Sequence, residues 1–134
     1  MSSPERPAAG IVVLPSPYPF AETVSRLLRA IEAHGIKLFA VIDQTAEAVA
    51  VGMSLSPTTL ILFGNPKAGT PVMQERPWSA IDLPLKALIV ESVPGQVCVC
   101  LNAAAYIADR HGLSPNLLPN LAAAERLVAM ALAG

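Results

Sequence analysis

The sequence predicts an α+β fold, a two-layer sandwich in which a mainly antiparallel sheet of about five strands carries helices on one face. Three observations lead to this prediction. Short apolar runs alternate with segments of helical periodicity, two such runs flank a Pro-Gly turn, and the last third of the chain is helical in pattern. At 134 residues the chain has the length of one domain.

The first half of the chain supplies three strands and two helices. Residues 1–9 are polar and proline-bearing, so we expect a flexible N-terminal tail before a single domain at 10–134. Strands are predicted at residues 10–14, 36–42 and 59–63. Helices are predicted at residues 20–34, ending at Gly35, and at residues 44–51, with Asp43 as the N-cap.

The second half begins with a long connection at residues 64–83, within which Thr70 and Pro71 suggest the cap and first position of a one-turn helix. Residues 85–91 and 96–101 then predict a hairpin, because Pro94-Gly95 suits a type II turn. Two helices follow, at residues 103–111 and 116–132.

The composition is unusually poor in charge. Hydrophobic residues make up 53% of the chain and charged residues 14%, whereas globular domains carry about 25% charged residues. With so few charged residues, part of the surface of the domain must be apolar. Monomers rarely expose large apolar patches, so we expect another surface to cover it. We therefore expect a homodimer, because two-fold pairs are the commonest closed assemblies.

Several partners are disfavoured by the sequence. The nine Lys and Arg residues are scattered and the net charge is −1, so we expect no nucleic acid partner. Residues 48–66 form the longest uncharged stretch, but glycine, serine, threonine and proline interrupt it, so we expect no membrane-spanning segment. The apolar run at residues 8–14 makes a poor signal peptide, which predicts a cytoplasmic protein.

Cys98 and Cys100 lie two residues apart in the last predicted strand, so both should point to one face of the sheet. That spacing is awkward for a disulfide. Two thiolates could begin a metal site, but no neighbouring Cys or His in the sequence completes a ligand set. We interpret both as small apolar residues and predict neither a metal nor another cofactor.

The chain resembles a known family in two runs, Phe63-Gly64-Asn65-Pro66-Lys67-Ala68-Gly69-Thr70-Pro71-Val72-Met73 and Ile81-Asp82-Leu83-Pro84-Leu85-Lys86-Ala87-Leu88. Ser16-Pro17-Tyr18, Thr23, Pro57-Thr58-Thr59-Leu60, Tyr106 and Arg110-His111-Gly112-Leu113 agree as well. On these residues the chain is similar to the domain of unknown function 302 family over roughly residues 11–113.

The resemblance implies a TATA-binding-protein-like fold, without any implication of DNA binding. It also implies a bacterial protein, cytoplasmic or exported, that forms homodimers and has no settled activity. One departure stands out. The family usually has His after the Asp that ends the second strand, whereas this chain has Asp43-Gln44. Any role of that imidazole in relatives is lost here.

The run from Gly64 to Thr70 follows a strand, as a phosphate-binding loop does, but it lacks Lys directly after the second glycine. ATP hydrolysis is therefore not supported. One interpretation is a weaker anion site, in which the amides of Gly69 and Thr70 and the side chain of Lys67 hold a phosphate or carboxylate. The alternative is a glycine-dependent loop capped by Thr70.

Asp82 and Lys86 flank Leu83-Pro84-Leu85 and could act as an acid–base pair or as part of an anion site. The alternative is a structural ion pair at the start of a strand. His34 and His111 each precede a glycine and are interpreted as helix-end residues. No nucleophile, His and acid arrangement is recognisable.

Two aromatic residues have open roles. Trp78, the one tryptophan, lies in the long connection and is either a lid over a ligand or an anchor at a dimer contact. Tyr106 is interpreted as a core residue rather than an acid catalyst.

Taken together, the sequence favours a homodimer that binds a small anionic ligand in the loop region 64–86. The residues proposed to bind it are Asn65, Lys67, Gly69, Thr70, Asp82 and Lys86. Two alternatives stay open. One is an enzyme, a hydrolase or isomerase that uses Asp82 and Lys86, and the other is an interaction domain without a ligand.

Overall fold

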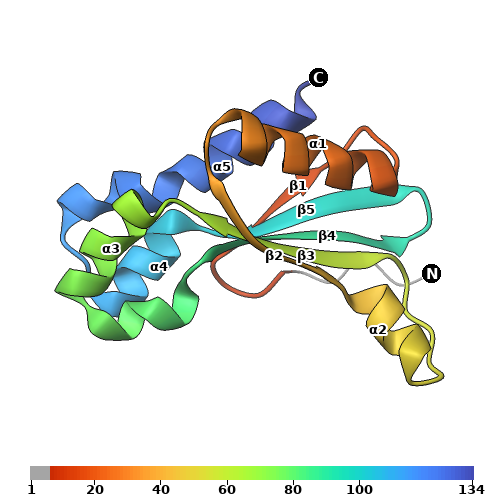
Figure 1. Cartoon of the computed structure of the whole chain (residues 1–134), viewed down its shortest axis with the longest axis horizontal. Helices are drawn as coiled ribbons and strands as arrows, with labels where there is room; N and C mark the ends of the chain where they lie inside the picture. The colour runs from red at the N-terminus through yellow and green to blue at the C-terminus, as the bar shows by residue number, and fades with distance from the viewer. Residues whose placement is uncertain (1–6) are drawn as a thin grey trace.

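A computed structural model describes residues 7–134 of the chain (Figure 1). Its five strands form one sheet in the order β1-β5-β4-β3-β2, and every neighbouring pair is antiparallel. The strands are β1 (Ile11–Pro15), β2 (Lys37–Asp43), β3 (Thr58–Gly64), β4 (Leu85–Val93) and β5 (Gln96–Asn102). The predicted α+β fold is confirmed, whereas most of the predicted tail, residues 1–6, lies outside the described residues.

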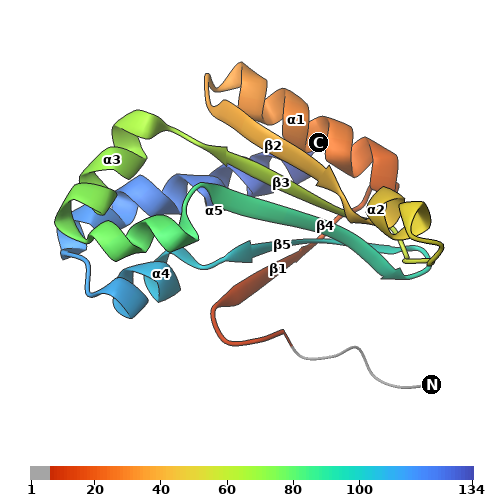
Figure 2. The same cartoon turned by 60° about the horizontal axis from the view of Figure 1, so that its bottom comes forward.

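Helices surround the sheet on one face and at both ends. α1 and α5 lie together along one face, α3 and α4 gather at one end, and α2 projects from the other (Figures 1 and 2). Their bounds are α1 (Phe20–Ala33), α2 (Gln44–Ala50), α3 (Pro66–Glu75), α4 (Ala104–His111) and α5 (Leu118–Leu132). Two 3₁₀ helices, Pro77–Asp82 and Pro115–Leu117, precede β4 and α5.

Local signals in the sequence place several helix ends as expected. The carboxylate of Asp43 accepts a hydrogen bond of 2.9 Å from the amide of Ala46 and so caps α2. His34 follows the last residue of α1, and its Nδ1 lies 2.8 Å from the carbonyl oxygen of Ala30. Gly112 ends α4 in the left-handed region, with φ of +61°. These helix-end predictions are confirmed.

α3 departs from the prediction. Residues 66–75 form a helix of nearly three turns where a long connection with a one-turn helix was expected. Asn65, not Thr70, is its cap, because the Asn65 side chain accepts the amide of Lys67 at 3.0 Å and Pro66 occupies the first position. Pro71 therefore lies inside the helix. The sequence holds two pairs in which a possible N-cap residue precedes a proline, Asn65-Pro66 and Thr70-Pro71. The helix begins at the first pair.

Two hydrophobic clusters stabilise the fold. The larger lies between the sheet and helices α1 and α5, and it includes Leu27, Ile61, Phe63, Ile89, Val99 and Val128, each no more than 1% exposed. The smaller lies between α3, α4 and the start of α5, and includes Val72, Ile107 and Leu121. Leu85 at the start of β4 packs against both clusters.

The face of the sheet opposite α1 and α5 is mainly apolar, with Lys86 as a charged member. One row of side chains crosses all five strands in register, and its members are half-buried or exposed: Val13, Cys100, Leu88, Leu60 and Ile42. Cys98 pairs with Val90 and Pro15 on the same face, as the spacing of the two cysteines predicts. A sheet face of this composition is the kind that another surface covers.

Candidate functional site

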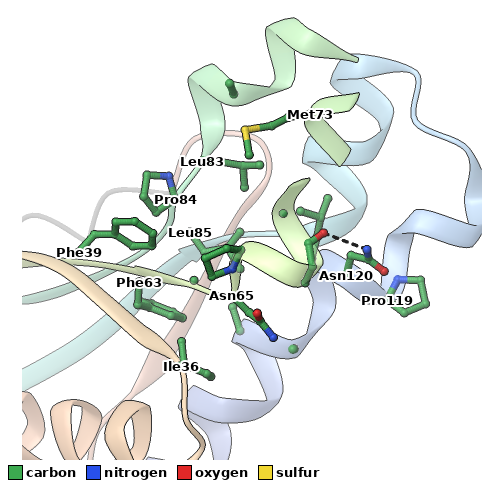
Figure 3. Close-up of a pocket in the computed structure, with 18 residues that line it drawn as sticks. Ile36, Phe39, Phe63, Asn65, Met73, Leu83, Pro84, Leu85, Pro119 and Asn120 are labelled. Carbon is green, nitrogen blue, oxygen red and sulfur yellow. Dashed lines mark hydrogen bonds between the residues drawn. The ribbon is translucent and has the colours of Figure 1, made fainter. Parts of the chain in front are cut away.

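A cavity of about 530 Å³ opens where the two hydrophobic clusters meet (Figure 3). Its walls come from the start of β2, the end of β3, α3, the start of β4 and the first turns of α5. Apolar members of the lining include Ile36, Phe39, Phe63, Met73, Ala80, Leu83, Pro84, Leu85, Pro119 and Leu121. The volume lies in the range of small-molecule sites in proteins.

The chain connections explain why this space stays open. α3 begins directly after β3, so it leaves the end of the sheet instead of packing on its face. Gly69 on α3 adds no side chain to the cavity. A Cβ at this position would lie 3.8 Å from Leu83 Cδ1 and 3.9 Å from Met73 Cε, and both of these residues line the cavity. Figure 3 shows Met73 and Leu83 toward one end of the lining, and Ile36 and Phe63 toward the other.

Two side-chain amides supply the polar part of the lining, Asn65 and Asn120. Asn120 Nδ2 donates a hydrogen bond of 2.9 Å to the carbonyl of Ala68, so it ties α5 to α3. Asn65 Oδ1 accepts the amide of Lys67, as described above. Within residues 7–134, the structure gives no hydrogen-bond partner to Asn65 Nδ2 or to Asn120 Oδ1, so one donor group and one acceptor remain for a ligand.

The six residues proposed from the sequence do not form one cluster. Asn65 and Gly69 line the cavity. Lys67 and Thr70 lie on the exposed side of α3, and the lining contains no Lys, Arg, His, Asp or Glu among the described residues. The predicted role for the amides of Gly69 and Thr70 is wrong in one respect: the amide of Gly69 already donates to the carbonyl of Asn65 at 2.9 Å within the helix.

Asp82 and Lys86 do not pair with each other. Asp82 instead accepts hydrogen bonds from Arg110 at 3.1 and 3.2 Å, and its Oδ2 lies 2.5 Å from His111 Nε2. Lys86 Nζ donates to the carbonyl of Pro84 at 3.2 Å. The spacing of four residues suggested a pair, but the strand that begins at Leu85 directs Lys86 onto the open face of the sheet, opposite Leu62.

Further predictions concern single residues. The prediction that Tyr106 is a core residue is wrong, because its side chain is 44% exposed. Its ring packs over the backbone of Gly10. Trp78 is 88% exposed. Gln44 is the first residue of α2, at the opposite end of the sheet from α3, so it does not reach the cavity (Figure 1).

Burial raises the pKa of the Cys100 thiol, and the neighbouring Cys98 raises it further. The thiol at Cys100 is therefore protonated near neutral pH and a poor metal ligand in that form. In residues 7–134 there is no group of three or more His, Cys, Asp or Glu side chains that could hold a metal ion.

Comparison with known proteins decides the family. The model of the family described as Domain of unknown function DUF302 matches residues 12–133, nearly the whole chain. This chain belongs to the DUF302 family. A crystal structure of an uncharacterized conserved DUF302 protein from Bacillus stearothermophilus superposes with a TM-score of 0.78, covering 94% of this chain and 98% of that one. At 18% identity, that likeness shows the shared DUF302 fold.

Curated relatives of this DUF302 chain carry a different description. Fluoride-specific ion channel FluC 1 from Brucella suis is 38% identical over 105 residues, which are 78% of this chain and 41% of that protein. FluC 1 from Brucella abortus has the same identity over 105 residues, 39% of its length. The DUF302 chain thus spans about two fifths of these relatives. None of its helices within residues 7–134 has the length and hydropathy needed to cross a membrane.

Proposed function

We propose that this DUF302 protein binds a small, mainly apolar molecule in the cavity between α3, α5 and the sheet. The observation that carries the proposal is the lining, where apolar side chains surround about 530 Å³ and the polar groups are confined to Asn65 and Asn120. Binding sites for small molecules combine an apolar lining with a few placed polar groups. The loop region 64–86, expected from the sequence to bind a ligand, supplies much of this wall.

The two asparagines define the polar end of the ligand. Asn65 Nδ2 can donate a hydrogen bond, and Asn120 Oδ1 can accept one. The carbonyl of a neutral carboxamide can accept the hydrogen bond from Asn65 Nδ2, and one of its N–H groups can donate to Asn120 Oδ1. An anionic head, which the sequence favoured, would enter a lining without a cationic side chain among the described residues and would lose its hydration without compensation. A neutral amide on an apolar chain therefore fits better.

Calorimetric titration with a homologous series of straight-chain primary amides, from butanamide to decanamide, tests the proposal. Each buried methylene contributes about 0.8 kcal/mol, so affinity should rise about fourfold per methylene until the cavity is filled. The matched alkanes test the head, because they should bind more weakly at equal chain length. Affinity that does not depend on chain length would contradict an apolar cavity site.

We also propose that two copies pair through the open face of the sheet. The row from Val13 through Leu88 to Ile42 is apolar across all five strands, and a two-fold axis would place it against its own copy. Five strands about 4.8 Å apart and about 20 Å long give a flat sheet face of roughly 500 Å² per copy. This area is of the order of a small protein–protein interface.

Sedimentation velocity tests the pairing. The wild type should sediment as a dimer, and Leu88→Lys, at the centre of the row, should sediment as a monomer with an unchanged circular dichroism spectrum. Val49→Lys is the matched control, because Val49 is 64% exposed on α2. A monomeric wild type would show that the chain does not pair at all. A dimer that persists in Leu88→Lys would show that the two copies pair through another surface.

The curated relatives support a second candidate function, a response to fluoride. The relatives that match this chain over 105 residues are named fluoride-specific ion channels, so a segment of this kind occurs within such proteins. Melting curves in sodium fluoride and sodium chloride at equal ionic strength test the idea. A fluoride-specific rise in melting temperature would support it, whereas identical curves would exclude fluoride as a direct ligand of the isolated chain.

A further inference from the structure

A second pocket, of about 300 Å³, lies beside the 3₁₀ helix that follows α3. Its lining consists of Arg76, Pro77, Trp78, Arg110 and His111. It shares no lining residue with the apolar cavity, and its chemistry is different, since two arginines and a histidine line it together with an exposed tryptophan. Such a set is typical of a site for anions.

The structure holds both arginines in place. Arg110 Nη1 donates to both carboxylate oxygens of Asp82, at 3.1 and 3.2 Å. Arg76 Nε donates to the carbonyl of His111 at 3.2 Å, and Arg76 Nη1 donates to the carbonyl of Glu75 at 3.2 Å. Within residues 7–134 the Nη2 groups of both arginines have no hydrogen-bond partner, so each guanidinium keeps donors for a ligand.

Two acidic side chains, Asp82 and Glu75, lie near the arginines of this pocket. Asp82 is only 16% exposed and contacts both Arg110 and His111. The carboxylate of Glu75 is engaged by Ser114, at 2.7 Å from its amide and 2.6 Å from its hydroxyl. Arg76 bonds to carbonyl oxygens, which carry no formal charge. Glu75 keeps its negative charge and also interacts electrostatically with Arg76. The anion site therefore rests on the Nη2 donors of the two guanidinium groups and not on an excess of positive charge.

Trp78 adds a flat apolar surface beside these cations. It is the one tryptophan of the chain, it is 88% exposed, and it lines the pocket together with both arginines. An indole face stacks on aromatic rings and is the strongest aromatic partner for cations. A ligand that carries both a ring and a negative charge would satisfy the indole and the guanidinium groups at once.

We propose that this pocket binds a small planar aromatic anion, with its ring on Trp78 and its carboxylate or phosphate between Arg76 and Arg110. A guanidinium group can bind either a carboxylate or a phosphate, because both anions carry two oxygens at the spacing of its two parallel N–H donors. The ring and the charge are both required for tight binding. The pocket is independent of the apolar cavity, so either proposal can fail without the other.

The intrinsic fluorescence of Trp78 reports directly on this site. Benzoate and phenyl phosphate are titrated against the wild type, with acetate and inorganic phosphate as charged compounds without a ring and benzyl alcohol as a ring without charge. The aromatic anions should quench Trp78 saturably and bind at least tenfold more tightly than the other three compounds. Equal affinity for benzoate and acetate, or no saturable quenching up to the solubility limit, would overturn the proposal.

Variants then assign the two contacts. Arg76→Gln should weaken benzoate at least tenfold, whereas Arg29→Gln, an exposed arginine of α1, should leave it unchanged. By calorimetry, Trp78→Ala should bind benzoate no better than acetate. Arg76→Lys is the check on folding, because it keeps the charge and should bind with intermediate affinity. An equal loss in Arg29→Gln and Arg76→Gln would show screening by overall charge and overturn the site.

Discussion

The Asn120 side chain donates a hydrogen bond of 2.9 Å to the carbonyl of Ala68, and this bond joins two walls of the apolar cavity. It links residues 52 positions apart, on two helices that also contact each other through the smaller hydrophobic cluster. The bond has two effects. It fixes the spacing of α3 and α5, and it leaves the Asn120 oxygen available to a ligand.

Replacement of Asn120 by alanine should therefore destabilise the protein. The loss of one side-chain hydrogen bond to the backbone costs about 1 kcal/mol. Asn116→Ala is the matched control, because Asn116 is exposed just before α5 and should change stability by less than about 0.5 kcal/mol. Urea unfolding measures both variants. Equal midpoints for the two would show that the Asn120 bond contributes nothing.

Gly69→Ala should stabilise the fold. Gly69 lies inside α3 with a helical backbone, and an added Cβ would meet Leu83 and Met73 at 3.8 and 3.9 Å, which is ordinary van der Waals contact. Glycine in a helix interior costs about 1 kcal/mol relative to alanine. The unfolding free energy in urea should therefore rise by about 0.5–1 kcal/mol, and a fall would indicate that α3 packs more tightly there than the structure shows.

Gly10→Ala should be strongly destabilising. Gly10 has φ of +80°, and a Cβ there would overlap the ring of Tyr106 at Cγ and both Cδ atoms. The left-handed backbone costs alanine about 1–2 kcal/mol, and the overlap adds about 1–3 kcal/mol.

The double variant separates these two costs. In a Tyr106→Ala background the overlap is gone, so Gly10→Ala should cost only the backbone part. Thermal unfolding of the four proteins in this cycle gives both terms. If Gly10→Ala costs the same in both backgrounds, the ring of Tyr106 does not lie over Gly10.

The Glu75–Ser114 contact predicts a pH dependence. Hydrogen bonds from the Ser114 hydroxyl and amide hold the pKa of Glu75 below its ordinary value of 4.5. Because the pKa is lower in the folded protein, the ionised carboxylate stabilises the fold above pH 4.5, and this contribution disappears as pH falls through the lowered pKa. The stability difference between the wild type and Glu75→Gln should thus shrink from pH 7 to pH 3. A constant difference would contradict the contact.

Most of the fold was predictable because its signals are local. Apolar runs of strand length, the Pro94-Gly95 turn and the Asp43 cap each act within a few residues, and all are confirmed. The start of α3 was missed for a local reason as well, since Asn65-Pro66 and Thr70-Pro71 are equivalent as cap-proline pairs in sequence. Only packing decides between them.

The sites were much less predictable. Asn65 and Gly69 were identified and line the cavity, but its α5 wall at Pro119 and Asn120 carries no signal beyond a helical pattern. Asp82 was singled out with the wrong partner, because its partner His111 lies 29 residues away and residues so far apart meet only through the tertiary fold. Cavities arise from segments distant in sequence, and composition does not reveal them.

The most direct test of the apolar cavity is calorimetric titration of octanamide into Gly69→Leu and Gly69→Ala. The leucine side chain would extend from α3 toward Met73 and Leu83 and occupy ligand space, whereas alanine adds one methyl group at ordinary contact distance. Octanamide binding should fall at least tenfold in Gly69→Leu and stay within about twofold of wild type in Gly69→Ala. Wild-type affinity in Gly69→Leu, with the variant folded, would show that the molecule binds outside this cavity.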